Sequence, residues 1–323
     1  MTRTTRRVGT ILLTLAALGY LVWQVDLETT VDILRNANLA WFALSVAIML
    51  FTVPVLAARW GWLLGAHDIH ERLPWLTRAY FVAYTAGQVL PTSLGGDAVR
   101  VVETTRRHPG RATVVTGTVL LERGLGGAAT VGLGAVGFIL SIGEYDVTAY
   151  LWLEGVFVFG TLLLGFLFFA RSARPLLRKT QPLLERVRLE KPVRHFYMGV
   201  HHYRGHPGLL GKVLALTVAV QAVRILSIWA GAKAVGIDLD PRIYYVFGPL
   251  LFLVMLVPFT LNGLAVREAF FVSFLGSVGV GADEAFAAGF LFFLVTLLLA
   301  FPGGVIMLRE GLRRGPRPEI EHG

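Results

Sequence analysis

Long apolar runs separated by short, charged loops make up most of this chain. A helix needs about 20 apolar residues to cross a bilayer, and several uninterrupted runs approach or exceed that length. These runs are 8–25, 40–65, 112–142, 149–170, 213–235 and 284–308. The pattern predicts an all-α integral membrane protein.

A further apolar run, 76–100, is interrupted by Pro91 and by Gly95-Gly96. The helix before it returns to the cytoplasm, and the arginine-rich loop after it is also typical of the cytoplasmic side. A segment that starts and ends on one side is predicted to be a re-entrant hairpin. Non-helical backbone at that depth must be enclosed by protein or must line a water-filled cavity.

The apolar run 243–280 is interrupted in a similar way, between Pro258 and Gly263. The last helix, 284–308, is expected to end in the cytoplasm because a cluster of arginines follows it. The run 243–280 then makes an even number of crossings. It is predicted to be either a hairpin entered from outside or two full helices.

The two interruptions are copies of one another. Residues 91–100 read PTSLGGDAVR and residues 258–267 read PFTLNGLAVR, with six identical positions and no gap. Each half of the chain reads helix, helix, broken hairpin, helix, in opposite orientations. This predicts an inverted-topology repeat, with repeat one at about 8–142 and repeat two at about 149–308, in one transmembrane domain over 1–323. Helix breakers at matching places in two such halves indicate a transporter binding site.

Positive charge is concentrated in loops beside the apolar runs. The net charge is +9, and the absence of cysteine from all 323 residues excludes disulfides and thiolate metal sites. The basic segment 171–212 holds ten Lys/Arg against two Glu. It is predicted either to lie on anionic lipid of the inner leaflet or to be a solvated linker. The charge pattern does not indicate nucleic-acid binding.

Ionisable residues at membrane depth are costly and suggest function by default. Asp97 and Arg100 lie at the first interruption, where backbone N–H groups of Gly95-Gly96 are predicted to face a cavity that binds an anion. Arginine suits a phosphate because its guanidinium donates two parallel hydrogen bonds. The alternative is that the acids simply pair with arginines and hold the hairpins together.

Other candidates lie in the apolar runs and at the second interruption. Glu122 and Arg123 are adjacent on a helix and point about 100° apart. One is expected to face the cavity and the other to pack against the first hairpin. Arg224 is a further candidate, whereas Arg59 is expected to reach a membrane interface. The second interruption contributes Asn262, Gly263, Arg267 and Glu268.

Enzyme signatures are few. A P-loop would need glycine at His206, and no H-E-x-x-H motif occurs, so ATP hydrolysis and zinc hydrolysis are not expected. No cofactor or metal site is predicted. Asp26 and Glu28, just outside the first helix, resemble the paired acids of membrane glycosyltransferases that use polyprenyl-phosphate sugars. The alternative is that they are ordinary loop acids, since the outer loops are short for an acceptor site.

The chain resembles the flippase-like family typified by the transmembrane domain of lysylphosphatidylglycerol synthase. The resemblance rests on 90–100, 120–123 and 258–268, and it covers nearly all of the chain. Relatives often have a second glycine near Asn262, which can adopt similar backbone geometry. The soluble aminoacyl-transfer domain of the full synthase does not follow here, so synthesis of lysylphosphatidylglycerol is not expected. The resemblance implies a functional set of Asp97, Arg100, Glu122, Arg123, Arg267 and Glu268.

These features predict a flippase-like transporter rather than an enzyme. It would move an anionic phospholipid or isoprenoid-linked lipid between leaflets of a prokaryotic cytoplasmic membrane, with both termini cytoplasmic. Arg100 and Arg267, one from each half, are expected to hold the phosphate at the midplane. Asp97, Glu122 and Glu268 would pair with them when the site is empty. The alternatives are a polyprenyl-phosphate-dependent membrane glycosyltransferase and an accessory membrane subunit.

Overall fold

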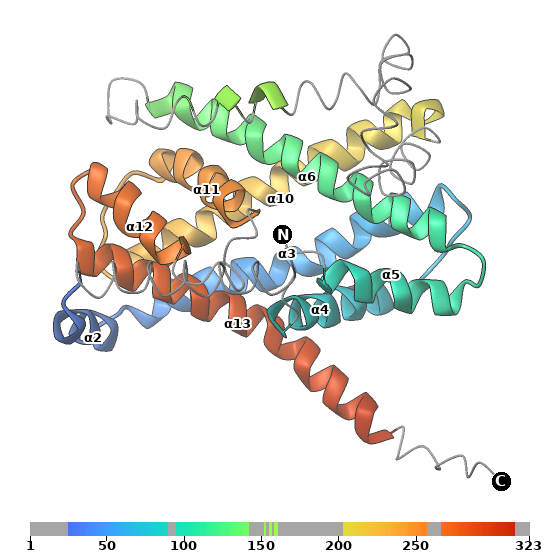
Figure 1. The fold of residues 1–323 in the computed structure, drawn as a ribbon, viewed down its shortest axis with the longest axis horizontal. Coiled ribbons are helices and arrows are strands. Elements are labelled where there is room, and N and C mark those ends of the chain that lie inside the picture. Colours follow the sequence, from blue (N-terminus) through green and yellow to red (C-terminus); the bar gives the residue numbers. More distant parts are fainter. Residues whose placement is uncertain are drawn as a thin grey trace, which may run out of the picture.

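Helices account for all the regular secondary structure in the described part of the chain (Figure 1). The structure is a computed structural model that describes residues 25–89, 95–141, 203–256 and 266–313, with 152, 155, 156 and 158–160. The main helices are α2 (Leu27–Arg35), α3 (Leu39–Gly65), α4 (Leu73–Val89), α5 (Gly95–Arg107), α6 (Ala112–Ser141), α10 (Pro207–Ala234), α11 (Pro241–Leu256), α12 (Val266–Ser277) and α13 (Ala282–Arg313), with a 3-10 turn η2 (Tyr203–Gly205). The predicted all-α class is confirmed for these residues.

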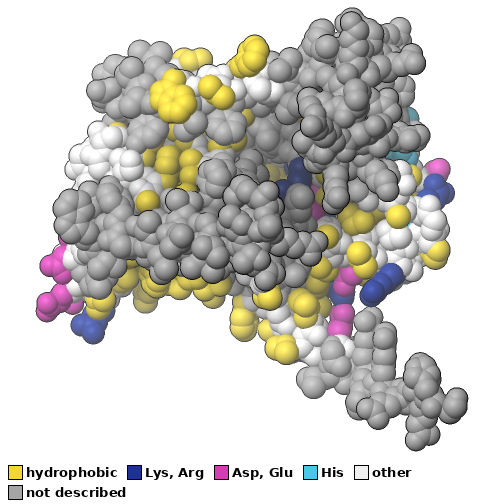
Figure 2. Space-filling model, in the orientation of Figure 1, with side chains coloured by type: hydrophobic (Ala, Val, Ile, Leu, Met, Phe, Trp, Pro, Cys, Tyr) yellow, Lys and Arg dark blue, Asp and Glu magenta, His cyan; other side chains and the backbone are white. Residues whose placement is uncertain are grey.

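Four of the described helices, α3, α6, α10 and α13, are long and apolar enough to cross a membrane. They confirm the predicted runs 40–65, 112–142, 213–235 and 284–308. The predicted run 8–25, apart from Val25, and most of 149–170 lie outside the described residues. Large apolar side chains stay exposed on these helices (Figure 2), and extensive apolar surface of this kind marks a membrane-facing protein.

Glycines allow close approaches between several of the helices. α6 packs along α11, and α13 packs against α4. A Cβ at Gly137 of α6 would overlap the backbone of Tyr245 in α11, and a Cβ at Gly303 of α13 would overlap the carbonyl oxygen of Phe81 in α4. Small residues at such contacts are typical of packed membrane helices.

The first interruption separates α4 from α5, and these two helices pack against each other. Gly96, in the first turn of α5, lies so close to the carbonyl oxygen of Ala83 in α4 that a Cβ would overlap it. Glycine is therefore needed for this approach. Pro91 belongs to residues 90–94, which lie outside the described residues.

The second interruption separates α11 from α12. α11 has 16 residues and α12 has 12, so each described helix is shorter than the about 20 residues of a full crossing. Pro258, Asn262 and Gly263 lie in 257–265, outside the described residues. Each interrupted run thus has one described helix before its undescribed residues and one after them.

Two segments outside the predicted membrane-spanning runs contain helix. α2 occupies most of 26–39, and the Asp26 side chain caps it by accepting hydrogen bonds from two backbone N–H groups of the first turn. α10 begins at Pro207, in a position where the missing N–H of proline costs nothing. Residues 207–212 of the predicted basic segment are therefore helical, which corrects its boundary. The remainder of that segment up to 202 lies outside the described residues.

Candidate functional site

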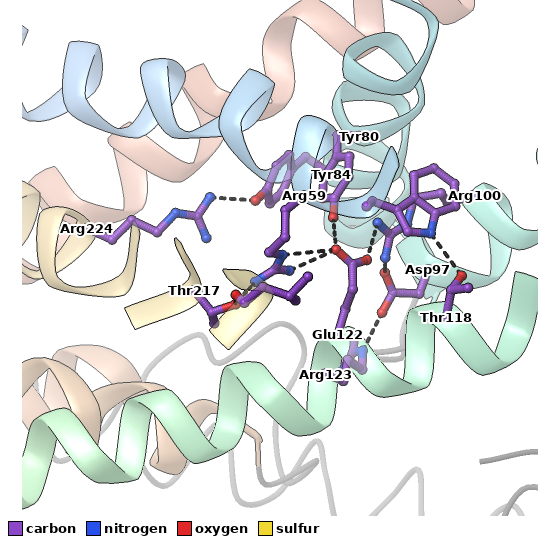
Figure 3. Close-up of polar contacts among 12 residues, drawn as sticks. Arg59, Tyr80, Tyr84, Asp97, Arg100, Thr118, Glu122, Arg123, Thr217 and Arg224 are labelled. Carbon is purple, nitrogen blue, oxygen red and sulfur yellow. Dashed lines mark hydrogen bonds and ion pairs between the residues drawn. The ribbon is translucent and has the colours of Figure 1, made fainter. Parts of the chain in front are cut away.

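A cavity of about 390 Å³ opens between α3, α4, α5, α6, α10 and α11. Cavities of about 300–1,000 Å³ hold small ligands, so this one has room for a lipid head group. On the face of the molecule drawn in Figure 2, basic and acidic side chains lie together in a recess. Figure 3 shows the polar contacts of residues that line the cavity. The charged residues that line the cavity are Arg59, Asp97, Arg100, Glu122, Arg123 and Arg224.

Five of these side chains form one chain of ion pairs with alternating sign (Figure 3). Arg59 Nη2 lies 2.9 Å from Glu122 Oε1, and Arg100 Nη1 lies 2.8 Å from Glu122 Oε2. Arg100 Nη2 lies 3.0 Å from Asp97 Oδ1, and Arg123 Nε pairs with the other oxygen of Asp97. The chain begins and ends with an arginine, so it has one positive charge in excess.

Arg100 is enclosed at the centre of this ion-pair chain. Its guanidinium carbon lies 4.3 Å from the ring centroids of both Trp60 and Tyr80, and the residue is 3% exposed. The Tyr80 hydroxyl donates to Glu122 Oε1 at 2.8 Å. With Nη1 donating to Glu122, Nη2 donating to Asp97 and two aromatic rings against its guanidinium, Arg100 has few donors left for a ligand. This geometry therefore favours a positioning role for Arg100 rather than the predicted direct contact with a phosphate.

The ion-pair chain follows from spacing on two helices. Asp97 and Arg100 are three residues apart at the start of α5, so they share one face. Glu122 and Arg123, adjacent on α6, reach different partners, Arg100 and Asp97 respectively. The prediction that one of them faces the cavity and the other packs against the first interrupted segment is wrong, because both line the cavity and both pair with residues of α5. The predicted pairing of the acids with arginines is confirmed for Asp97 and Glu122.

Two other sequence predictions about this region are wrong. Arg59 does not reach an interface but is 6% exposed, because Glu122 and the Thr217 hydroxyl, 2.8 Å from its Nη1, satisfy the guanidinium inside the protein. Gly95 and Gly96 do not line the cavity but are buried. Gly96 faces α4 because the helix pair needs a close approach there.

A polar stripe on α10 consists of Thr217, Gln221 and Arg224, and all three residues line the cavity. Their spacing of four and three residues places them on one face of the helix. Gln221 Nε2 donates to Thr130 Oγ1 of α6 at 2.9 Å. Of these three residues only Arg224 was predicted from the sequence, although polar residues at helical spacing within an apolar run were a usable signal.

Arg224 lies apart from the carboxylates, on the other side of the view in Figure 3. Its Nε donates to Thr52 Oγ1 at 3.0 Å, and its Nη2 donates to the Tyr84 hydroxyl at 2.5 Å. Neither partner is an acid, and no carboxylate in the described ranges pairs with Arg224. The cavity therefore contains a positive charge whose counter-ion the described residues do not supply.

Arg267 and Glu268 do not join this site. The two residues do not line the cavity. Arg267 is 2% exposed, its Nε donates to Glu268 Oε1 at 2.9 Å, and its guanidinium carbon lies 4.9 Å from the Phe293 ring centroid. The prediction that Arg100 and Arg267 share one phosphate site is therefore not supported, because each is buried against its own carboxylate.

Residues beside the two breaks nevertheless meet the same turn of α13. Gln88, two residues before the first gap in the described chain, donates to the carbonyl oxygen of Thr296. Arg267, the second described residue after the other gap, lies over Phe293. Thr296 itself donates to the carbonyl oxygen of Phe293. α13 is therefore a shared contact of both interrupted segments.

Comparison with known proteins places the whole site within a known membrane region. Residues 7–304 match the family described as lysylphosphatidylglycerol synthase TM region. A curated relative, "Glycosyltransferase AglD" of Haloferax volcanii, is 27% identical in an alignment 344 residues long. The alignment covers 94% of this chain. The alignment covers 54% of that protein, so the chain spans about half the length of the relative.

Proposed function

This chain belongs to the lysylphosphatidylglycerol synthase TM region family, and we propose that its cavity binds the phosphate of an anionic lipid. The protein then carries that head group between the leaflets of a prokaryotic cytoplasmic membrane. The lipid is a phospholipid or an isoprenoid-linked lipid. The proposal includes no cofactor and no covalent change to the lipid.

The charge of the cavity is the observation that carries this proposal. Four arginines and two carboxylates line it, which leaves two positive charges in excess. These side chains belong largely to helices that are long and apolar enough to cross a membrane. Charge at that depth is costly unless it is paired. A phosphate would supply the pairing, since guanidinium groups bind its oxygens through parallel, charge-assisted hydrogen bonds.

Arg123 is the best placed arginine for the first contact with a head group. Its side chain is 34% exposed, compared with 7% for Arg59 and 4% for Arg100. Gly126 and Gly127, three and four residues further along α6, share its face. A Cβ at either glycine would meet no atom within 4 Å, so open space lies beside Arg123.

Replacing Arg123 with Gln is expected to slow lipid transport about tenfold or more, because a hydrogen bond to a charged group contributes about 1.5–3 kcal/mol. The measurement uses protein in liposomes with tail-labelled NBD-phosphatidylglycerol, whose outer-leaflet fraction is bleached by dithionite. Arg106→Gln, at an exposed position of α5, is the matched control and should transport at the wild-type rate. A wild-type rate for folded Arg123→Gln would contradict this contact.

For alternating access we further propose that α4–α5 and α11–α12 are re-entrant hairpins of an inverted repeat. The shortness of these helices and their shared contact with α13 support this arrangement. Two inverted halves around one site allow each side to open in turn. Both termini then lie in the cytoplasm.

Single cysteines at Ser93 and Thr260 test this topology, since the chain has no cysteine of its own. An impermeant maleimide should label Ser93→Cys only from the cytoplasmic side and Thr260→Cys only from outside. Inside-out and right-side-out vesicles give the two readings. Labelling of both cysteines from the same side would rule out the inverted arrangement.

A second function is favoured by the name of the relative, a glycosyltransferase. In that case the same cavity would hold the phosphate of a polyprenyl-phosphate sugar donor, and this chain would act as the membrane part of a transferase. Of the two acids expected to serve it, Asp26 has structural contacts: its side chain caps α2, and its backbone N–H donates to Asp283 Oδ1 at 2.8 Å. The two functions differ in outcome, because a transporter releases its lipid unchanged and a transferase removes its sugar.

A further inference from the structure

Arg224 lies at a different depth in the membrane helices from the ion-pair chain. Its partner Thr52 is the middle residue of α3, 13 residues from either end. Arg59, the residue of α3 that pairs with Glu122, is seven residues further along. Seven residues correspond to about 10 Å along a helix axis.

The polar stripe of α10 gives the same separation independently. Thr217 accepts a hydrogen bond from Arg59 of the ion-pair chain, and Arg224 lies seven residues later on the same face. This is again about 10 Å. Gln221 and its partner Thr130 lie between the two levels. The cavity is therefore lined by a polar track that connects the ion-pair chain to Arg224.

Arg224 has donors to spare at the deeper level. Its Nε and Nη2 bind Thr52 and Tyr84, whereas its Nη1 donates to none of the described residues. The Tyr84 hydroxyl accepts from Arg224, so its own proton can be donated to another acceptor. An Arg N–H and a Tyr O–H held together form a suitable pair of donors for two oxygens of one phosphate.

Resting on the proposed function, we infer that Arg224 and Tyr84 form a second phosphate-binding position, about 10 Å deeper along the helices than Arg123 and the ion-pair chain. The ligand class is a lipid phosphate mono- or diester. A head group binds first at Arg123, moves past Gln221 and Thr130, and binds next at Arg224 near the middle of the membrane. Two positions keep the phosphate paired with arginine along a path on which an unpaired charge would be costly.

The test separates binding from movement. Binding of dioctanoyl phosphatidylglycerol to detergent-solubilised protein is measured by calorimetry, and transport by the NBD-phosphatidylglycerol assay. Arg224→Gln should bind the short-chain lipid within about threefold of wild type and transport at least about tenfold more slowly. Arg123→Gln should lose both binding and transport. Melting temperatures establish that each variant is folded.

The outcomes distinguish failure of the second binding position from failure of the proposed function. Wild-type transport by folded Arg224→Gln contradicts the second position while leaving the proposed function standing. Equal loss of binding in Arg224→Gln and Arg123→Gln also contradicts it, because it indicates a single position. Wild-type protein that transports neither NBD-phosphatidylglycerol nor NBD-farnesyl phosphate contradicts the proposed function itself.

Should Arg224→Gln fail to fold, Tyr84→Phe makes the same test with a smaller change. It removes one hydroxyl and leaves the guanidinium groups of Arg123 and Arg224 in place. Its transport should fall about threefold to tenfold, since one hydrogen bond to a charged ligand is lost. Its binding of dioctanoyl phosphatidylglycerol should stay within about threefold of wild type, because the position at Arg123 is intact. Wild-type transport by Tyr84→Phe would overturn the role of the Arg224–Tyr84 pair.

Discussion

Replacing Glu122 with Gln is expected to lower the free energy of unfolding by about 3–5 kcal/mol, because breaking a buried ion pair leaves uncompensated charge. Glu122 is 3% exposed and is the only described carboxylate that contacts both Arg59 and Arg100. Glutamine fills the same space and still offers an oxygen to Tyr80, but it neutralises neither guanidinium. The measurement is the melting temperature of purified protein in detergent.

Glu103→Gln is the matched control for this change. Glu103 also pairs with an arginine, Arg78, but its side chain is 25% exposed. Arg78 would keep its second partner, Glu310, and a pair of this exposure contributes about 1 kcal/mol or less. A melting temperature for Glu122→Gln no lower than that of Glu103→Gln would mean that the ion-pair chain does not hold α5 against α6.

Replacing Gly127 with Leu is expected to stop lipid transport while leaving the protein folded. A Cβ at Gly127 meets no atom within 4 Å, so the leucine side chain would extend into the cavity without a clash. Leucine also favours the helix over glycine, by somewhat less than about 1 kcal/mol. The loss of transport would thus come from occupied space and not from a weakened fold. The NBD-phosphatidylglycerol assay measures it.

Gly132→Leu is the control on the same helix. Gly132 is exposed on α6, and a Cβ there also meets no atom within 4 Å. This variant should transport at the wild-type rate, since the added side chain lies outside the cavity lining. Normal transport by folded Gly127→Leu would show that the lipid path does not pass through the cavity.

The membrane-spanning helices were predictable because a bilayer demands a long apolar run whatever its neighbours are. Helix starts were less predictable. α10 begins at Pro207, six residues before the predicted start. The prediction was late because His206 and Lys212 lower the hydropathy of this stretch. α2 was missed because its amphipathic sequence is too short and too polar to register as an apolar run.

The pairing inside the site depends on contacts that spacing along one helix cannot reveal. Arg59 meets Glu122 and Thr217, which are 63 and 158 residues away in the sequence. An arginine near the end of an apolar run is usually able to reach the interface, and only the presence of these partners reverses that expectation. The two tyrosines of the cavity were missed for the same reason.

The internal repeat predicted equal roles for Arg100 and Arg267, but their acids differ in position. In the first copy Asp97 precedes the arginine by one turn, and α6 contributes Glu122. In the second copy Leu264 replaces that aspartate, and Glu268 follows the arginine directly. Arg267 therefore pairs with its neighbour. In the cavity the second half of the chain contributes Arg224 instead.

Protection of a single thiol tests phosphate binding in the cavity most directly. Gly127→Cys introduces one cysteine into a chain that has none, and its rate of reaction with a maleimide is followed in detergent. Dioctanoyl phosphatidylglycerol or farnesyl phosphate should slow that reaction several-fold, whereas dioctanoylglycerol and farnesol, which lack the phosphate, should not. Gly132→Cys should react with the maleimide at the same rate whichever of the four lipids is added. Equal reaction of Gly127→Cys with all four lipids would contradict the binding of a lipid phosphate in this cavity.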